Sequence, residues 1–169
     1  MNAHQMKDGQ RVFLRELCKG CGMCAETCYA EALVMTGKWM TVQEVIDEVE
    51  KDKPFYENSG GGLTLSGGEP LLQGQFVREL LEESKRHQIN TVVDTAGNVP
   101  WETFEAVLPF VDLFLYDIKV MAQEKHREVT GATNTRIINN LKNLVQRDVD
   151  VRIRVPVIPG VNDTSTEME

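Results

Sequence analysis

The sequence predicts an α/β fold in which about four short parallel strands alternate with helices, preceded by a separate segment that carries cysteines. Three observations lead to this prediction. Short apolar runs alternate with longer, helix-spaced runs between residues 63 and 158. Glycine, proline and asparagine separate many of these runs. All four cysteines fall within the eleven residues CKGCGMCAETC. We therefore expect a domain boundary near residue 40, giving segments 1–40 and 41–169.

The first predicted helix covers residues 41–52. Thr41 and Glu44 form a capping-box pattern, and Val42, Val45, Ile46 and Val49 follow at helical spacing. Pro54 and the glycines of SGGG are expected to end this segment.

Strands and helices then alternate along the rest of the chain. Strands are predicted at 63–66, 90–95, 111–119 and 151–158, and helices at 71–88, 101–110 and 134–148. The apolar faces of two helices are read as Leu72, Phe76, Leu80 and Leu81, and as Ile137, Ile138, Leu141, Leu144 and Val145. Such alternation indicates right-handed βαβ units and a parallel sheet, although four strands are too few to close a barrel.

Composition narrows the class of protein. The chain has 169 residues, a net charge of −8 and no basic stripe, which argues against a nucleic-acid partner. No apolar run approaches the roughly 20 residues of a membrane span. The polar N-terminus lacks a signal-peptide core, so we expect a cytoplasmic location with reduced thiols. His4, His87 and His126 are scattered without ligand-pair spacing, and we expect all three to face solvent.

The cysteines are spaced C-x2-C-x2-C-x3-C, at Cys18, Cys21, Cys24 and Cys28. Disulfides across such short gaps would be strained, and zinc ribbons use well-separated pairs. Three thiolates on one tight turn favour a [4Fe–4S] cluster, with zinc and free structural cysteines as alternatives. Because no second cysteine run exists, Cys28 either completes the same cluster or is left over.

Polar side chains follow each predicted strand, where ligands bind in βα folds. The segments are SGGEP, DTAGN, YDIK and VRIRVPVIPG, and their candidate binding residues are Glu69, Asp94, Asp117, Lys119 and Arg154. Two glycines let a ligand approach the backbone. Carboxylates bind an ammonium group and a ribose diol, and Lys119 or an arginine binds a carboxylate. An amino acid joined to a nucleoside carries all of these groups.

SGGGLTLSGGEPLLQ, DTAGN, LFLYDIKV, HREVTGATN and RIRVPVIPGVND resemble segments of the glycyl-radical-enzyme activating enzymes, which are radical SAM proteins of the pyruvate formate-lyase activase type. The likeness runs from about residue 2 to 163. It implies a partial (βα)6 barrel at 41–169 and a ferredoxin-like iron–sulfur insert at 1–40.

The resemblance also implies roles for individual residues. Gly67, Gly68 and Glu69 would bind the amino group of S-adenosylmethionine, with Asp94 nearby. Asp117 would hold the ribose hydroxyls, Lys119 the methionine carboxylate, and Arg154 would lie near the cofactor. The implied reaction is reductive cleavage to a 5′-deoxyadenosyl radical, which takes a hydrogen atom from a glycine of a partner glycyl radical enzyme. A flavodoxin- or ferredoxin-type donor would supply electrons.

One departure from the family is the missing CxxxCxxC motif, which holds the catalytic cluster in these enzymes. The four cysteines are therefore expected to bind an auxiliary [4Fe–4S] cluster, and no catalytic residue is assigned. The chain looks truncated at both ends and is expected to be inactive alone. The alternatives are a non-catalytic iron–sulfur electron-transfer or binding module on the same scaffold, and a zinc-binding structural domain. The partner could be a formate-lyase, a diol dehydratase, a choline lyase or a decarboxylase.

Overall fold

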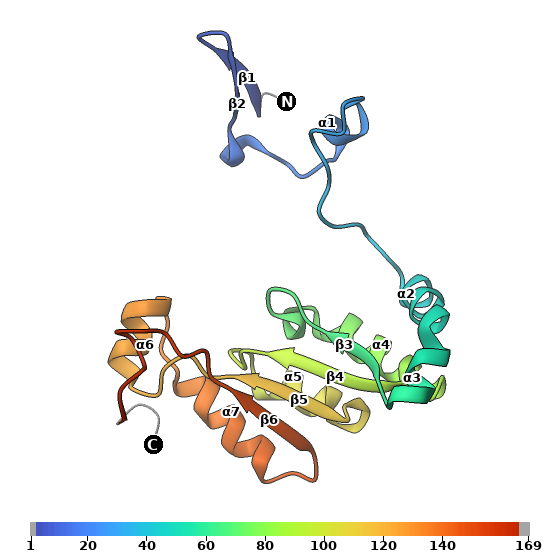
Figure 1. Ribbon diagram of the computed structural model, residues 1–169, viewed down its shortest axis with the longest axis vertical. Helices are drawn as coiled ribbons and strands as arrows, with labels where there is room; N and C mark the ends of the chain where they lie inside the picture. Colours follow the sequence, from blue (N-terminus) through green and yellow to red (C-terminus); the bar gives the residue numbers. More distant parts are fainter. Residues whose placement is uncertain (1–2, 166–169) are drawn as a thin grey trace. The chain divides into compact units, whose positions relative to one another are not determined.

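The computed structural model describes residues 3–165 and divides the chain into two compact units, Met1–Met40 and Thr41–Glu169 (Figure 1). The predicted segments extend to residues 1–2 and 166–169, which lie outside the described range. No helix within the described range is long and apolar enough to cross a membrane.

The first unit begins with an antiparallel hairpin of β1 (His4–Lys7) and β2 (Gln10–Phe13). A 3-10 turn (Arg15–Leu17) and the short helix α1 (Met23–Glu26) follow. This hairpin is not among the predicted elements, although its turn carries a sequence signal. Asp8 and Gly9 both have positive φ, and Asp-Gly is a favoured pair in two-residue hairpin turns.

The second unit contains a four-stranded parallel sheet in the order β3-β4-β5-β6, which confirms the predicted fold class. The strands are β3 (Gly62–Leu65), β4 (Asn90–Thr95), β5 (Leu113–Asp117) and β6 (Asp150–Arg154). The helices are α2 (Val42–Val49), α3 (Lys53–Ser59), α4 (Gly74–Arg86), α5 (Trp101–Val107), α6 (Gln123–Thr130) and α7 (Thr135–Val145). Further 3-10 turns lie at Glu50–Asp52, Pro70–Gln73 and Leu108–Phe110.

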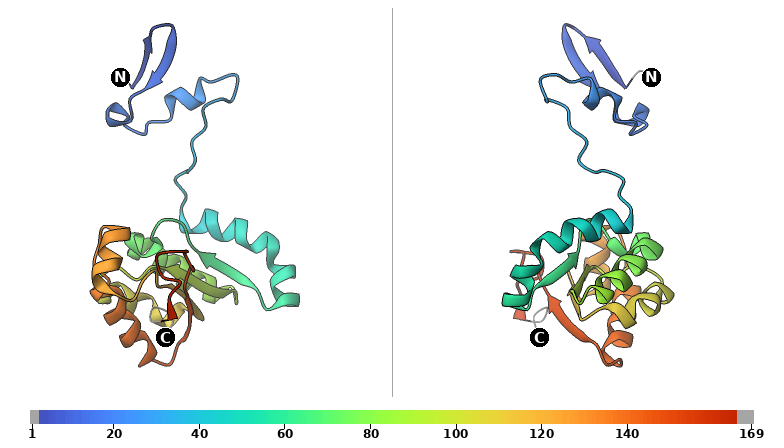
Figure 2. Two further views of the ribbon diagram at one scale, coloured as in Figure 1. Left: turned by 60° about the vertical axis from the view of Figure 1, so that its left-hand side comes forward. Right: turned by 90° about the vertical axis from the view of Figure 1, so that its right-hand side faces the viewer.

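The hydrophobic core lies on one face of this sheet, which helices α4, α5 and α7 cover (Figure 2). Val93, Phe114 and Tyr116 point to that face and are fully buried. Because side chains alternate along a strand, Asp94 and Asp117 point to the opposite, half-buried face. The same alternation that builds the core therefore directs two carboxylates to the open face of the sheet.

Several predicted details of the helices need correction. The capping box is present, with Glu44 N donating to Thr41 Oγ1 (3.2 Å) and Thr41 N to Glu44 Oε2 (2.7 Å). Pro54, however, lies in the first turn of α3, where its missing N–H costs nothing, so it starts a helix instead of ending one. Leu72 is 75% exposed because it lies in a 3-10 turn ahead of α4. Val145, the last residue of α7, is also exposed.

The last predicted strand is shorter than expected, because β6 ends at Arg154. Residues 155–158 continue without strand pairing. Pro156 lacks the N–H that a longer ladder would need. Arg154 is therefore the last residue of its strand, which places its side chain at the end of the sheet.

Candidate functional site

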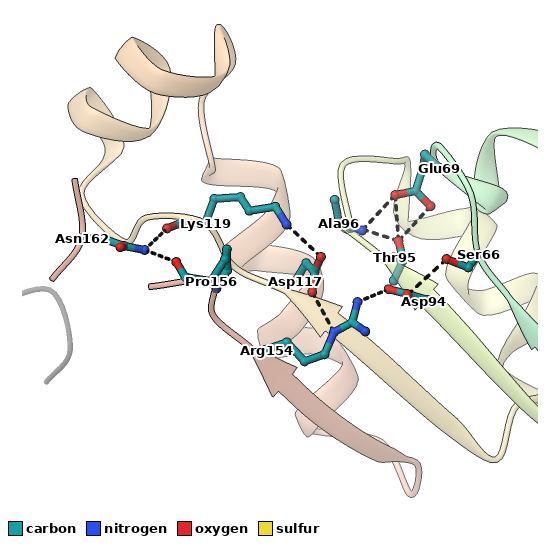
Figure 3. Close-up of polar contacts among 11 residues, drawn as sticks. Ser66, Glu69, Asp94, Thr95, Ala96, Asp117, Lys119, Arg154, Pro156 and Asn162 are labelled. Atoms are coloured by element: carbon teal, nitrogen blue, oxygen red, sulfur yellow. Dashed lines mark hydrogen bonds and ion pairs between the residues drawn. The ribbon is translucent and has the colours of Figure 1, made fainter. Parts of the chain in front are cut away.

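The polar side chains predicted at the strand ends meet on the open face of the sheet (Figure 3). Strand pairing places Asp117 opposite Arg154. Arg154 Nε donates to Asp117 Oδ1 (2.9 Å), and its Nη2 donates to Asp94 Oδ1. Lys119 Nζ donates to the other carboxylate oxygen of Asp117 (2.8 Å). Four of the five side chains predicted to converge therefore lie together, at the ends of three neighbouring strands. The fifth, Glu69, makes its hydrogen bonds to other residues.

The negative charges of Asp94 and Asp117 equal in number the positive charges of Lys119 and Arg154 in this cluster. Burial raises the pKa of Asp117, but the hydrogen bonds from Lys119 and Arg154 outweigh it and hold that pKa below the usual value. The hydrogen bond to Asp117 in turn raises the pKa of Arg154. Asp117 is therefore ionised at neutral pH and is ready to accept hydrogen bonds.

Glu69 has a different position from the other predicted binding residues. Its carboxylate accepts hydrogen bonds from Thr95 Oγ1 (2.8 and 2.9 Å), Ala96 N (3.0 Å) and Leu71 N (3.2 Å). These contacts fasten the SGGEP loop to the turn after β4. The side chain of Glu69 thus has protein partners for both oxygens.

The loop ahead of Glu69 is open. Gly67 has φ +130°, a value that favours glycine, and no atom would lie within 4 Å of a Cβ added at Gly67 or Gly68. Ser66 Oγ donates to Asp94 Oδ2 (3.2 Å), which ties the start of this loop to the neighbouring strand end. The backbone of the two glycines is therefore accessible to a ligand beside Asp94.

The DTAGN turn is fixed from the core side. Gly97 has φ +74°, and a Cβ there would lie 1.7 Å from the hydroxyl oxygen of Tyr116. That hydroxyl donates to Ile137 O (2.7 Å), and burial raises its pKa. Asn140 Nδ2 donates to the carbonyls of Gly97 (2.8 Å) and Val99 (2.8 Å). Only glycine fits where this turn passes over Tyr116.

Asn162 is not among the predicted site residues, yet it supports the Lys119 end of the site. Its Nδ2 donates to Lys119 O (2.7 Å) and Pro156 O (2.8 Å), and its Oδ1 accepts from Ile158 N (2.6 Å). Asn162 is 1% exposed. It therefore joins the segment after β5 to the segment after β6. The Pro-Gly-Val-Asn sequence marked a turn, but nothing in it indicated which carbonyls the asparagine would bind.

The four cysteines lie in the first unit, and none of them forms a disulfide. Cys18, Cys21 and Cys24 line a cavity of about 290 Å³, together with apolar residues such as Phe13, Leu17 and Met35. Gly20 N donates to Cys18 Sγ (3.4 Å), and Gly20 and Gly22 have positive φ. Across residues 3–165, no three Cys, His, Asp or Glu side chains are grouped closely enough to share one metal ion. Three thiols around one cavity, with an amide directed at sulfur, nevertheless fit a cluster whose thiolates each bind a different iron.

The expectation that all three histidines face solvent is wrong. His126 is 4% exposed, and its Nδ1 lies 2.7 Å from Ala132 O. The Nδ1 atom of His87 lies 2.6 Å from Glu50 Oε1. Both ring nitrogens of His4 are buried, and His4 lines the same cavity as the three cysteines. A lone histidine gives no sequence signal that distinguishes these environments.

Comparisons with known proteins show the family of this chain. The family described as the radical SAM superfamily matches residues 18–168. An isethionate sulfite-lyase activating enzyme of Oleidesulfovibrio alaskensis is 46% identical over 99% of this chain and 56% of its own length. A choline trimethylamine-lyase activating enzyme of the same organism is 42% identical over 97% of this chain and 63% of its own length.

A solved structure is also similar. The crystal structure of a domain of a pyruvate-formate lyase-activating enzyme from Bacteroides vulgatus has a TM-score of 0.60 and 32% identity, and the match covers 64% of this chain and 67% of that one. The chain spans about half the length of the curated relatives it matches.

Proposed function

Because the chain belongs to the radical SAM superfamily, we propose that the open face at the ends of β3 to β6 binds S-adenosylmethionine. The observation that carries this proposal is the cluster of Asp94, Asp117, Lys119 and Arg154 beside an exposed glycine loop. It offers anions and cations in the arrangement that an amino acid joined to a nucleoside requires.

We assign the polar groups of the ligand as follows. The backbone of Gly67 and Gly68 and the carboxylate of Asp94 receive the amino group. Asp117 accepts the ribose hydroxyls, and Lys119 binds the methionine carboxylate. The Lys119–Asp117 ion pair opens when the ligand binds, because both partners then gain contacts to it. Arg154 keeps Asp94 and Asp117 at a fixed separation. Glu69 holds the glycine loop in place through Thr95 and Ala96.

We further propose that this site belongs to an activating enzyme for a glycyl radical enzyme, since the named relatives are activating enzymes. A reduced iron–sulfur cluster would supply, when bound, the electron for reductive cleavage of S-adenosylmethionine. The cysteine run at Cys18–Cys28 holds an auxiliary cluster, and a flavodoxin- or ferredoxin-type protein delivers electrons.

Calorimetric titration of the full chain with S-adenosylmethionine tests the binding site. Asp117→Asn removes an ionised acceptor, and we expect binding to weaken about tenfold to a hundredfold, as for a hydrogen bond to a charged group.

The matched control is Asp112→Asn. Asp112 lies just before the other end of β5, where it pairs with Lys85. This control should bind like the unmodified chain, with circular dichroism confirming that both variants fold. Equal binding by the two variants, or no binding by the unmodified chain, would show that the site is wrongly assigned.

A further inference from the structure

The cavity that three cysteines line is also lined by a histidine whose ring nitrogens form no hydrogen bond within residues 3–165. Both ring nitrogens of His4 are buried, and neither has a hydrogen-bond partner among the residues that the structure describes. A buried polar group left unpaired destabilises the folded state. His4 lines the cavity with Cys18, Cys21 and Cys24.

The position of His4 is fixed by the hairpin. Strand pairing sets it opposite Phe13, and the two rings lie 4.9 Å apart between centroids. Leu14 N donates to Ala3 O (2.7 Å), which extends the pairing at the open end of the hairpin. The hairpin therefore holds the imidazole at the wall of the cysteine cavity.

Cys28 is not among the residues that line this cavity. It follows α1, where its backbone N donates to Ala25 O (3.1 Å) and its carbonyl accepts from Glu31 N (2.9 Å). A cube-shaped [4Fe–4S] cluster takes four protein ligands, and the residues that line the cavity include three cysteines and one histidine.

We propose that His4, and not Cys28, is the fourth ligand of the iron–sulfur cluster held by Cys18, Cys21 and Cys24. This inference rests on the proposed cluster at the cysteine run. A neutral ring nitrogen of His4 donates its lone pair to the fourth iron, which pairs one of the buried nitrogens. Histidine in place of thiolate raises the reduction potential of a cluster, as it does in Rieske centres. The cluster would therefore accept an electron more readily than an all-cysteine one.

The test uses the full chain, reconstituted under anaerobic conditions with ferrous iron and sulfide. Iron and sulfide are counted, and the dithionite-reduced cluster is examined by pulsed EPR for coupling to nitrogen. We expect a strong ¹⁴N coupling that changes to a ¹⁵N pattern when the chain is labelled with ¹⁵N-histidine only. This labelling separates a histidine ligand from backbone amides near the sulfides.

Four variants divide the possibilities. Cys28→Ser should keep the full iron content and the nitrogen coupling. His4→Cys should keep the cluster, lose the coupling and show a lower reduction potential. His4→Ala should lose its fourth iron on mild oxidation and give the [3Fe–4S] signal. His87→Ala, a histidine change in the second unit, should match the unmodified chain.

The outcomes distinguish a wrong ligand role for His4 from a wrong assignment of the cluster itself. If the chain retains no iron, or takes zinc instead, both the cluster and the role of His4 are wrong. If iron is retained but histidine labelling changes nothing, or Cys28→Ser abolishes the cluster while His4→Ala keeps it, only the ligand assignment fails. His4→Cys and the labelling still decide the question if His4→Ala fails to fold.

Discussion

Replacing Gly97 with alanine tests the account of the DTAGN turn. A Cβ at Gly97 would lie 1.7 Å from the hydroxyl oxygen and 2.2 Å from Cζ of Tyr116. Tyr116 is fully buried, so its ring cannot move aside without disturbing the core.

Three costs add in this variant. A non-glycine residue at φ +74° pays about 1 kcal/mol of backbone strain. Displacing Tyr116 breaks its buried hydrogen bond to Ile137 O, at about 1–3 kcal/mol. Forcing a methyl group into a packed site costs about 1–3 kcal/mol more. We therefore expect Gly97→Ala to lower the free energy of unfolding by at least about 3 kcal/mol.

Urea unfolding followed by tryptophan fluorescence measures this loss. Trp39 is fully exposed in the first unit, so a Trp39→Phe background leaves Trp101, which packs on Phe104, as the reporter of the second unit. Gly131→Ala is the matched control, because Gly131 has φ +80° but open space around its Cβ. The control should lose only about 1 kcal/mol. A similar loss in both variants would refute the claim that the turn is held against Tyr116.

Two further changes test other parts of the second unit. Thr41→Ala removes the cap of α2 and should lower the free energy of unfolding in urea by about 1 kcal/mol, whereas Thr41→Ser should be nearly neutral. An unchanged midpoint for the alanine variant would contradict the capping box. The hydrogen bond to Glu50 raises the pKa of His87 in the folded chain. The stabilisation by protonated His87 is therefore complete below the unfolded-state pKa of about 6.5. It is lost as pH rises through the higher folded-state pKa. His87→Gln should therefore flatten the fall in the urea midpoint as pH rises above about 6.5. An unaltered slope would show that another group titrates.

Much of the site could be predicted from local sequence because parallel strands end at one edge of a sheet. The polar residues after each apolar run therefore had to lie near one another, and Asp94, Asp117 and Arg154 do. The role of Glu69 could not be predicted this way. Its partners Thr95 and Ala96 lie 26 and 27 positions away in sequence, and no local pattern indicates that pairing.

The sequence by itself determined the alternation of strands and helices, the cysteine spacing and the choice of polar residues at the strand ends, because these depend on periodicity and on neighbours in the chain. Tertiary structure decided which contacts those residues make. In the folded chain Leu72 lies outside the core, and the carboxylate of Glu69 accepts a hydrogen bond from the amide of Ala96. His4 lines the cysteine cavity. Such contacts join residues that are distant in sequence, and only the packing of the chain brings them within bonding reach.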